Sequence, residues 1–368
     1  MVAGTIGPWI PTLKADNGLD AGELGLALAG FAVGLVLGTR CAGPAMRRLD
    51  GRAVIRIGIP CLAGALAMLP IAGGLVTFAL LLSIVGFASG LLDVVMNAEA
   101  VAVERALGRR VMSSLHGTWS VAVLFGAGTA SLAIAIGTSL EIALPSVAVV
   151  LVIASFPVLR WLPEDAPVRA NGTVARTPVG AVPRLRVLAL CAVAAASFLS
   201  EGVAIEWSAL LLRDGLGARA AIAGLGVVAF SAGMAVSRFL GDRAADRLGE
   251  RALVRVGAAT GAVALGASLI VGDATVAIGA FAVLGLGLGA VVPSAFRAAG
   301  GLRLGPDRTA LAIVVTAGYV GSIVGPLVVG LTADPYGLRV AFAIPVVASL
   351  LASAAAGATE EVPAGSVG

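Results

Sequence analysis

The chain carries an arginine-rich stretch, RRLDGRAVIRIG, at residues 47–58 and a related stretch, DRLGERALVRVG, at residues 246–257. The two 38-residue segments that end in these stretches align without a gap at an offset of 199 residues, and 11 of the 38 positions are identical. Three of the identical positions are arginines, Arg48, Arg52 and Arg56 in the first copy. Chance coincidence explains shared Gly and Ala better than it explains arginines in register, so the sequence predicts an internal duplication.

Composition places this duplication in a membrane. The chain has 368 residues, of which 59% are hydrophobic and 12% charged, and its mean hydropathy is +1.02. Apolar runs near helix length recur along the chain, whereas barrel strands would alternate over about ten residues. Twelve membrane-spanning helices are predicted at residues 1–13, 24–46, 57–73, 75–98, 111–136, 140–161, 187–212, 220–240, 252–271, 274–296, 309–332 and 339–356. The predicted fold class is therefore all-α and integral to the membrane.

The arginines give the orientation. Of the 25 Lys and Arg residues, 21 fall in or beside alternate loops, and Arg238 is counted among them. The opposite loops hold the remaining 4, which predicts that the arginine-rich side faces the cytoplasm. Topology accounts for the net charge of +4, so nucleic acid is not expected as a partner.

The duplication divides the chain into two six-helix bundles. We expect an N-terminal bundle at residues 1–161, a polar cytoplasmic linker at 162–186 and a C-terminal bundle at 187–368. Six spans return the chain to the starting side, so the bundles are parallel repeats. The first helix is short by comparison with its counterpart in the second half, from which we expect a natural start upstream of Met1.

The three cysteines, Cys41, Cys61 and Cys191, lie in or at the ends of apolar spans without C-x-x-C spacing. We expect buried thiols with no disulfide or metal role. No cofactor is expected either.

The repeated stretch resembles the signature loop of the major facilitator superfamily, G-x-x-x-D-R-x-G-R-R, which joins the second and third helices and often recurs between the eighth and ninth. The second copy matches at Asp246, Arg247, Gly249 and Arg251, and has Asp242 at the leading glycine. The resemblance covers the whole chain by topology. It implies two six-helix bundles of the major facilitator fold, whose first, fourth, seventh and tenth helices line a central cavity.

The first copy departs from the signature. It keeps Gly43, Arg48 and Arg52, but Arg47 stands at the aspartate position and Asp50 at a glycine position. In the family this loop forms salt bridges that hold one transport state, and we expect such a latch on the Asp246 side. The candidate gate residues are Arg48, Arg52, Asp246, Arg247 and Arg251. The alternative, that these arginines only set topology, remains open.

Ionisable residues inside spans are functional candidates because they are costly to bury in lipid. Asp93 and Asn97 share one face of the fourth helix. Glu201 and Glu206 lie five apart on the seventh helix, and so diverge by about 140°. Asp93 is expected in the cytoplasmic third and Glu201 beyond the midplane, too far apart to touch. Either carboxylate is a candidate for proton or substrate coupling, and a structural role is the alternative.

Three phrases, GLLDVVMNAEAVAVER at residues 90–105, MSSLHGTWS at 112–120 and EGVAIEWSALLLRDGLG at 201–217, resemble a bacterial branch of the superfamily that includes rhizopine-type transporters and sugar-porter-like permeases. The resemblance implies a polar, hydroxylated solute. The motif positions that it implies are Asp93, Asn97, His116, Trp119, Glu201, Glu206 and Trp207. For His116 a helix-packing role is the favoured reading.

The sequence thus predicts a secondary active transporter that moves a sugar, polyol or inositol derivative by alternating access with protons. Efflux of drug-like or metabolite substrates is the first alternative, and a non-transporting sensor or scaffold is the second. An enzyme is not expected, because the hydrolase motifs H-E-x-x-H and G-x-S-x-G are absent and there is a single histidine. We expect a monomer in the bacterial inner membrane.

Overall fold

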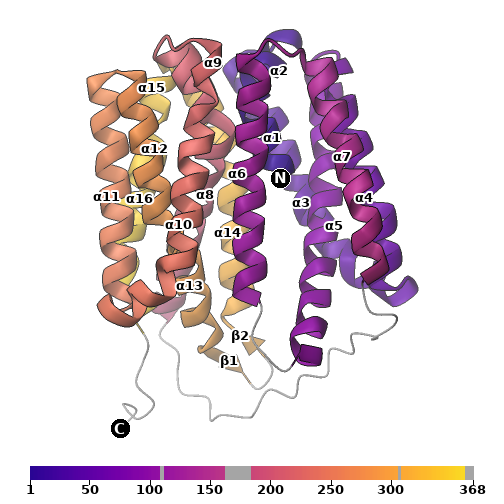
Figure 1. Cartoon of the computed structure of the whole chain (residues 1–368). Coiled ribbons are helices and arrows are strands. Elements are labelled where there is room, and N and C mark those ends of the chain that lie inside the picture. Colours follow the sequence, from indigo (N-terminus) through magenta and orange to yellow (C-terminus); the bar gives the residue numbers. More distant parts are fainter. Residues whose placement is uncertain (108–111, 162–183, 306–307, 361–368) are drawn as a thin grey trace.

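The structure, a computed structural model, is a bundle of helices that run between two ends of the molecule (Figure 1). It describes residues 1–107, 112–161, 184–305 and 308–360. In these ranges, eleven helices are long and apolar enough to cross a membrane. A shorter helical segment, residues 2–16, precedes them and completes the twelve predicted segments.

The first half of the chain contains six segments, the first of them in three pieces. They are α1 (Val2–Ile6), η1 (Gly7–Trp9) and α2 (Ile10–Asp16), then α3 (Ala21–Arg48), α4 (Gly51–Met68) with η2 (Leu69–Ile71), α5 (Leu75–Leu107), α6 (Met112–Ala135) and α7 (Leu140–Trp161). Residues 162–183 of the predicted linker lie outside the described residues, and α8 begins at Arg184.

The second half repeats the order with more interruptions. It contains α8 (Arg184–Leu210) with η3 (Leu211–Gly215), α9 (Ala220–Ala223) and α10 (Leu225–Leu248), α11 (Glu250–Val271), α12 (Ala274–Leu288) and α13 (Val291–Gly300), α14 (Leu311–Tyr336), and α15 (Leu338–Ala341), α16 (Ala343–Ala354) and η4 (Ala355–Thr359). The predicted tenth helix is therefore not continuous but broken between α12 and α13. A small antiparallel hairpin, β1 (Arg303–Gly305) and β2 (Arg308–Thr309), joins α13 to α14 and is the described exception to the all-α prediction.

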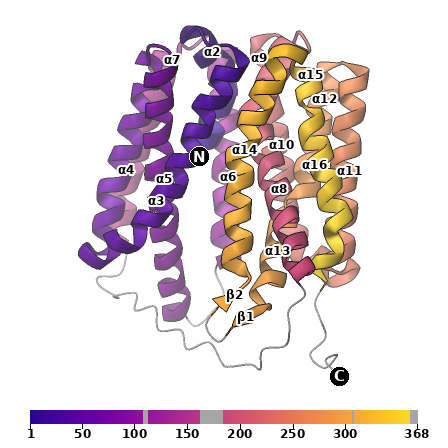
Figure 2. The same cartoon turned by 180° about the vertical axis from the view of Figure 1, so that it is seen from behind.

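The same helix pairings occur in both halves. In the first half α3 packs against α5, and α4 packs against α5 and α7; in the second half α10 packs against α12, and α11 packs against α12 and α16. The pairing of α1 with α6 is matched by that of α8 with α14. Seen from both sides, the halves stand next to each other with α6 and α14 near the middle (Figures 1 and 2). The fold is the predicted pair of six-helix repeats.

Glycine permits the closest of these pairings. A Cβ on Gly34 of α3 would collide with the backbone carbonyl of Ser83 in α5. At the equivalent place in the second half, a Cβ on Gly233 would collide with the carbonyl of Ala282 in α12. Small residues let helix backbones touch in a membrane, so the duplicated glycines mark the same seam twice.

The two arginine-rich loops turn by different means. In the second copy Gly249 adopts a φ of 80°, which favours glycine, and α10 ends there. In the first copy the equivalent Asp50 is extended, with a φ of −66°, and its side chain accepts a hydrogen bond from the Ala53 N–H at the start of α4. A helix cap therefore replaces the glycine turn, which explains how the first copy departs from the signature and still connects two helices.

The halves meet along three seams: residues 2–16 against α8, α3 against α14, and α6 against α10. We call the end of the molecule opposite the arginine-rich loops the outer end. There the Arg213 guanidinium donates a hydrogen bond of 3.0 Å to the Pro11 carbonyl oxygen across the halves. A Cβ on Gly25 would lie 2.7 Å from the Pro326 carbonyl oxygen. The outer ends are packed together, so this conformation is closed on the outer side.

The cysteine prediction is wrong in part. Cys41 and Cys61 are exposed on the outside of the bundle, and Cys191 is half-buried. All three are free thiols. Helices α3 and α4 turn Cys41 and Cys61 outward, whereas Cys191 of α8 packs against the hydrophobic core.

Candidate functional site

An arginine links three helices at the seam between the halves. The Arg238 guanidinium, on α10, lies 3.5 Å from a carboxylate oxygen of Glu201 on α8. It also donates a hydrogen bond of 2.9 Å to the Ser120 hydroxyl on α6 and lies 5.2 Å from the ring centroid of Trp119. One side chain of the second half therefore holds partners in both halves.

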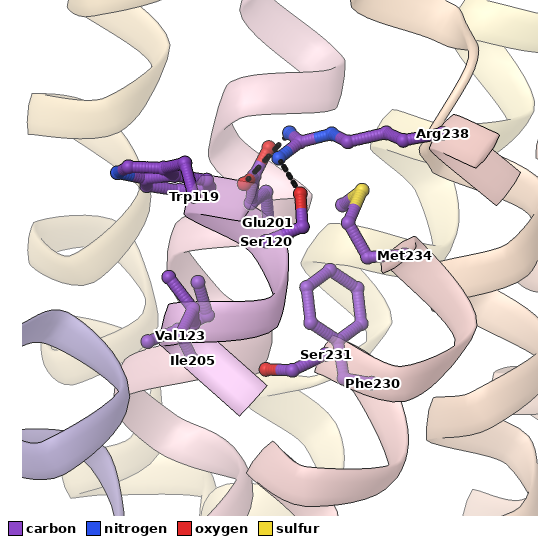
Figure 3. A pocket seen from close by; sticks show the side chains of 9 residues that line it. All are labelled: Trp119, Ser120, Val123, Glu201, Ile205, Phe230, Ser231, Met234 and Arg238. Atoms are coloured by element: carbon purple, nitrogen blue, oxygen red, sulfur yellow. Dashed lines mark hydrogen bonds and ion pairs between the residues drawn. The ribbon is translucent and has the colours of Figure 1, made fainter. Parts of the chain in front are cut away.

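These groups line a small pocket at the seam. Figure 3 shows the guanidinium reaching over Glu201 and Ser120, with the ring of Trp119 beside them. The lining residues are Trp119, Ser120, Val123, Glu201, Ile205, Phe230, Ser231, Met234 and Arg238. The side chains of Glu201 and Arg238 are 17% and 20% exposed, so their charges are largely shielded from solvent. The pocket offers an anionic acceptor, a cationic donor, two hydroxyls and an aromatic face.

Arg238 corrects the interpretation of the sequence. It was counted with the arginines of the cytoplasmic loops, but α10 continues to Leu248 and places Arg238 inside the span. The usable signal was its position within the predicted span at residues 220–240. An arginine there requires a partner, and Glu201 is that partner. Ser120, the other hydrogen-bond partner, carried no signal of its own.

Asp93 and Asn97 lie together on α5, away from this pocket. The Asn97 amide donates to the Asp93 backbone carbonyl at 2.8 Å and contacts its carboxylate at 3.3 Å. Asp93 is exposed and interacts electrostatically with Tyr319 of α14. The pair thus occupies a separate position on the inner part of α5, and Asp93 does not line the pocket of Glu201.

Two other predicted positions on α8 and α6 are Trp207 and His116. Trp207 is fully buried in the core, which indicates a packing role. His116 belongs to α6, but its side chain lies outside the described residues.

Glu206 lines a second pocket on another side of α8. This pocket lies between the first segment, α3, α5 and α8. Its lining residues are Ala3, Ile6, Gly7, Ile10, Leu28, Phe31, Leu82, Ile205 and Glu206. The Oε2 atom of Glu206 is inaccessible to solvent and has no hydrogen-bond partner in the structure. The two glutamates of α8 thus face different seams, in keeping with their five-residue spacing.

The inner corner of the second half contains a separate charged network. Arg297, on α13, forms ion pairs of 3.1 Å with Asp242 and 2.8 Å with Glu250. The Ser294 hydroxyl donates to the same Glu250 carboxylate. All four residues belong to one half, so this network ties α10, α11 and α13 together and does not bridge the halves.

The predicted gate residues are arranged differently from the expectation. Asp246 and Arg247 are exposed, and between described residues they form no ion pair within 4.0 Å. Arg251 instead pairs with Glu360 at 3.0 Å. In the first copy Arg48 is exposed, whereas Arg52 is half-buried and interacts electrostatically with Glu99 of α5. Among the described residues, the carboxylates in ion pairs at this corner are therefore Asp242, Glu250 and Glu360.

A metal centre has no basis among the described residues, where no group of three or more His, Cys, Asp or Glu side chains could hold an ion. The chemistry available at the seam is hydrogen bonding, charge pairing and stacking.

Comparison with known proteins gives consistent matches. The model of the Major Facilitator Superfamily matches residues 188–366. An uncharacterised MFS-type transporter of Yersinia pestis is 32% identical over 351 residues, which span 95% of this chain and 90% of that protein. The membrane protein MosC of Rhizobium meliloti is 28% identical over 329 residues, or 89% of this chain and 79% of that protein. The rhizobial match fits the bacterial branch expected from the three sequence phrases.

The fold has a close structural counterpart. The crystal structure of the nucleoside transporter NupG superposes with a TM-score of 0.70 at 14% identity and covers 97% of this chain and 96% of that one. At this identity the likeness concerns the fold alone.

Proposed function

This chain belongs to the Major Facilitator Superfamily of membrane transporters, and we propose that it carries a small hydroxylated solute inward together with protons. The solute class is a sugar, polyol or inositol derivative. The halves exchange access to the two sides of the bacterial inner membrane by rocking about their seams, and the monomer is the working unit.

The observation that carries this proposal is the cluster of Trp119, Ser120, Glu201 and Arg238 at the seam of α6, α8 and α10. A neutral polyol presents several hydroxyl groups, each of which both donates and accepts hydrogen bonds. Glu201 supplies an acceptor and Arg238 supplies donors, while the face of Trp119 suits the apolar side of a sugar ring. Residues from both halves contribute, so a bound solute would sense their relative movement.

The charge balance of the cluster favours a neutral solute over a lipophilic cation. Glu201 is already paired with Arg238, so a cationic substrate would meet a guanidinium at the same place. A cation would have to displace Arg238 or approach against its charge. This argument supports uptake of polar solutes over efflux of cationic drugs.

The proposal is tested in proteoliposomes that enclose a pH-sensitive dye. A panel of inositols, pentoses and hexoses is compared with cationic dyes under an imposed proton gradient. We expect proton movement that depends on one polyol or sugar, and we expect Glu201→Gln and Arg238→Lys to reduce it roughly tenfold or more, because each removes a charge-assisted hydrogen bond. Gradient-driven extrusion of the dyes, with no response to polyols, would replace the proposal with efflux.

Matched controls come from exposed positions outside the pocket. Glu141→Gln changes an exposed carboxylate of α7, and Arg243→Lys changes an exposed arginine of α10. Both should transport at close to the wild-type rate. Equal losses in all four variants would show that the cluster has no special role.

A further inference from the structure

The strongest unexplained feature is the second pocket, around Glu206. Apolar side chains surround this carboxylate, among them Ile6, Ile10, Leu28 and Leu82. One carboxylate oxygen has neither solvent contact nor a hydrogen-bond partner. An ionised carboxylate is disfavoured here, because no described group replaces the water that this oxygen loses.

Among the described residues that line the pocket, only Glu206 is ionisable, so no charge in the lining offsets this cost. The other charged side chains that the structure describes on the surrounding elements all lie outside this lining: Lys14 and Asp16 on α2, Glu23, Arg40, Arg47 and Arg48 on α3, Asp93 and Glu99 on α5, and Arg184, Arg186 and Glu201 on α8. The amino group of Met1 begins α1, and the Met1 carbonyl lies beside Gly126 of α6. Glu206 therefore fits this place as the neutral acid.

The pocket belongs to the closed conformation. Glu206 comes from the second half, whereas the first segment, α3 and α5 belong to the first half. The same segment is held against α8 close by, where Arg213 donates to the Pro11 carbonyl. If the halves separate at the outer end, this apolar contact parts and water can reach the carboxylate. The Glu206 carboxylate can then lose its proton in the open form, where water solvates the charge, but not in the closed form.

We propose that Glu206 binds a proton and that this protonation permits the outer side of the transporter to close. Glu206 is thus the site at which proton binding is coupled to the movement of the halves. Glu201, which is paired with Arg238, belongs to the proposed solute site instead. This inference rests on the proposed function for its purpose, but the event that it describes is a change of shape that needs no solute.

The test measures distance between the outer ends of the halves. Spin labels are placed at Asp16→Cys on α2 and Asp334→Cys on α14, both exposed positions, after Cys41, Cys61 and Cys191 are replaced by Ala. Pulsed electron paramagnetic resonance in lipid nanodiscs gives the distance distribution between pH 5 and pH 9, without solute. We expect one short distance at low pH and a growing longer component as pH rises. For a single proton, the ratio of the two populations changes by at most about tenfold for each pH unit.

Variants at position 206 decide the outcome. Glu206→Gln and Glu206→Met both remove the ionisable group, so each should keep the short distance across the whole pH range. The second variant guards against a folding defect in the first, and gel filtration monitors both. Glu141→Gln, which changes an exposed carboxylate at the start of α7, is the control and should respond to pH as the labelled parent does.

The proposal is overturned if the parent distance does not change with pH, or if both variants at position 206 still open at high pH. Because no solute is present, these results are independent of the transport assay. A pH-dependent distance without transport of any polyol would retain the role of Glu206 and reject the proposed substrate class.

Discussion

Glu201 and Glu206 occupy the same helix, five residues apart, and meet opposite surroundings. Glu201 faces the α6 and α10 seam, where Arg238 balances its charge. Glu206 faces the first segment, α3 and α5, where apolar side chains surround it. A turn of about 140° along one helix is enough to separate the two roles. The contrast teaches that the presence of a carboxylate in a span says little until its partner is known.

The largest expected loss of stability comes from breaking the ion pair between Glu201 and Arg238. Arg238→Met leaves the carboxylate of Glu201 shielded and without its cation, so we expect the free energy of unfolding to fall by about 2 kcal/mol. Chemical unfolding of the purified protein in detergent measures this change. Arg243→Met, at an exposed position of the same helix, should change it by less than about 0.5 kcal/mol.

A double variant sharpens that result. Glu201→Met combined with Arg238→Met removes both charges, and we expect it to recover more than half of the lost stability. A double variant no more stable than Arg238→Met would contradict the pairing of these two residues.

The second prediction concerns Glu206, the glutamate without a charged partner, and here we expect a gain in stability where Arg238→Met gives a loss. Glu206→Met replaces an unpartnered carboxylate by an apolar side chain of similar length, so we expect a gain of about 1 kcal/mol in the free energy of unfolding at neutral pH. The same unfolding assay measures it. Glu206→Gln should gain less because its amide also lacks a partner. If Glu206→Met lost stability, as is expected of Arg238→Met, the two glutamates would not differ as described.

The smallest expected change in stability comes from removing one partner of Arg238, the Trp119 ring, while the other partners stay in place. Trp119→Leu removes the ring under the guanidinium but leaves Glu201 and Ser120, so we expect a loss of about 0.5–1 kcal/mol. Trp119→Phe should retain part of that energy. In a background that already carries Arg238→Met, the Trp119→Leu change should cost measurably less, because the two side chains act on each other. Equal costs in the two backgrounds would place Trp119 outside the cluster.

Much of the fold was predictable because a membrane imposes strong regularities. Helix-length apolar runs, alternating arginine content and the offset of 199 residues give twelve segments in two repeats. The breaks inside these segments were not predictable. The interruption between α12 and α13 falls at Gly289 and Ala290. Glycine and alanine also occur inside the continuous helices of this chain, so these residue types did not signal a break.

The candidate site was predictable in its acids and not in its partners. Glu201 and Glu206 were recognised because ionisable residues are conspicuous in apolar spans, and Trp119 because the family resemblance implies it as a motif position. Arg238 was misassigned because its neighbours in sequence are the loop arginines. Its hydrogen bond to Ser120 joins residues 118 positions apart, and helix packing alone brings them together. The ion pairs of Asp242 and Glu250 with Arg297 were missed because the signature directs attention to Asp246.

Arg238 also bears on how fast the molecule can change shape. Its guanidinium pairs with Glu201 of the same half. Its hydrogen bond to Ser120 and its contact with the ring of Trp119 reach across to the other half. Movement along the α6 and α10 seam therefore breaks one charge-assisted hydrogen bond and one cation–π contact, about 2–4 kcal/mol together before water replaces them. An interaction of this size biases a conformational equilibrium without arresting it. The contacts at this seam are strong enough to favour one conformation of the halves. They are weak enough to permit domain motions on the scale of microseconds to milliseconds.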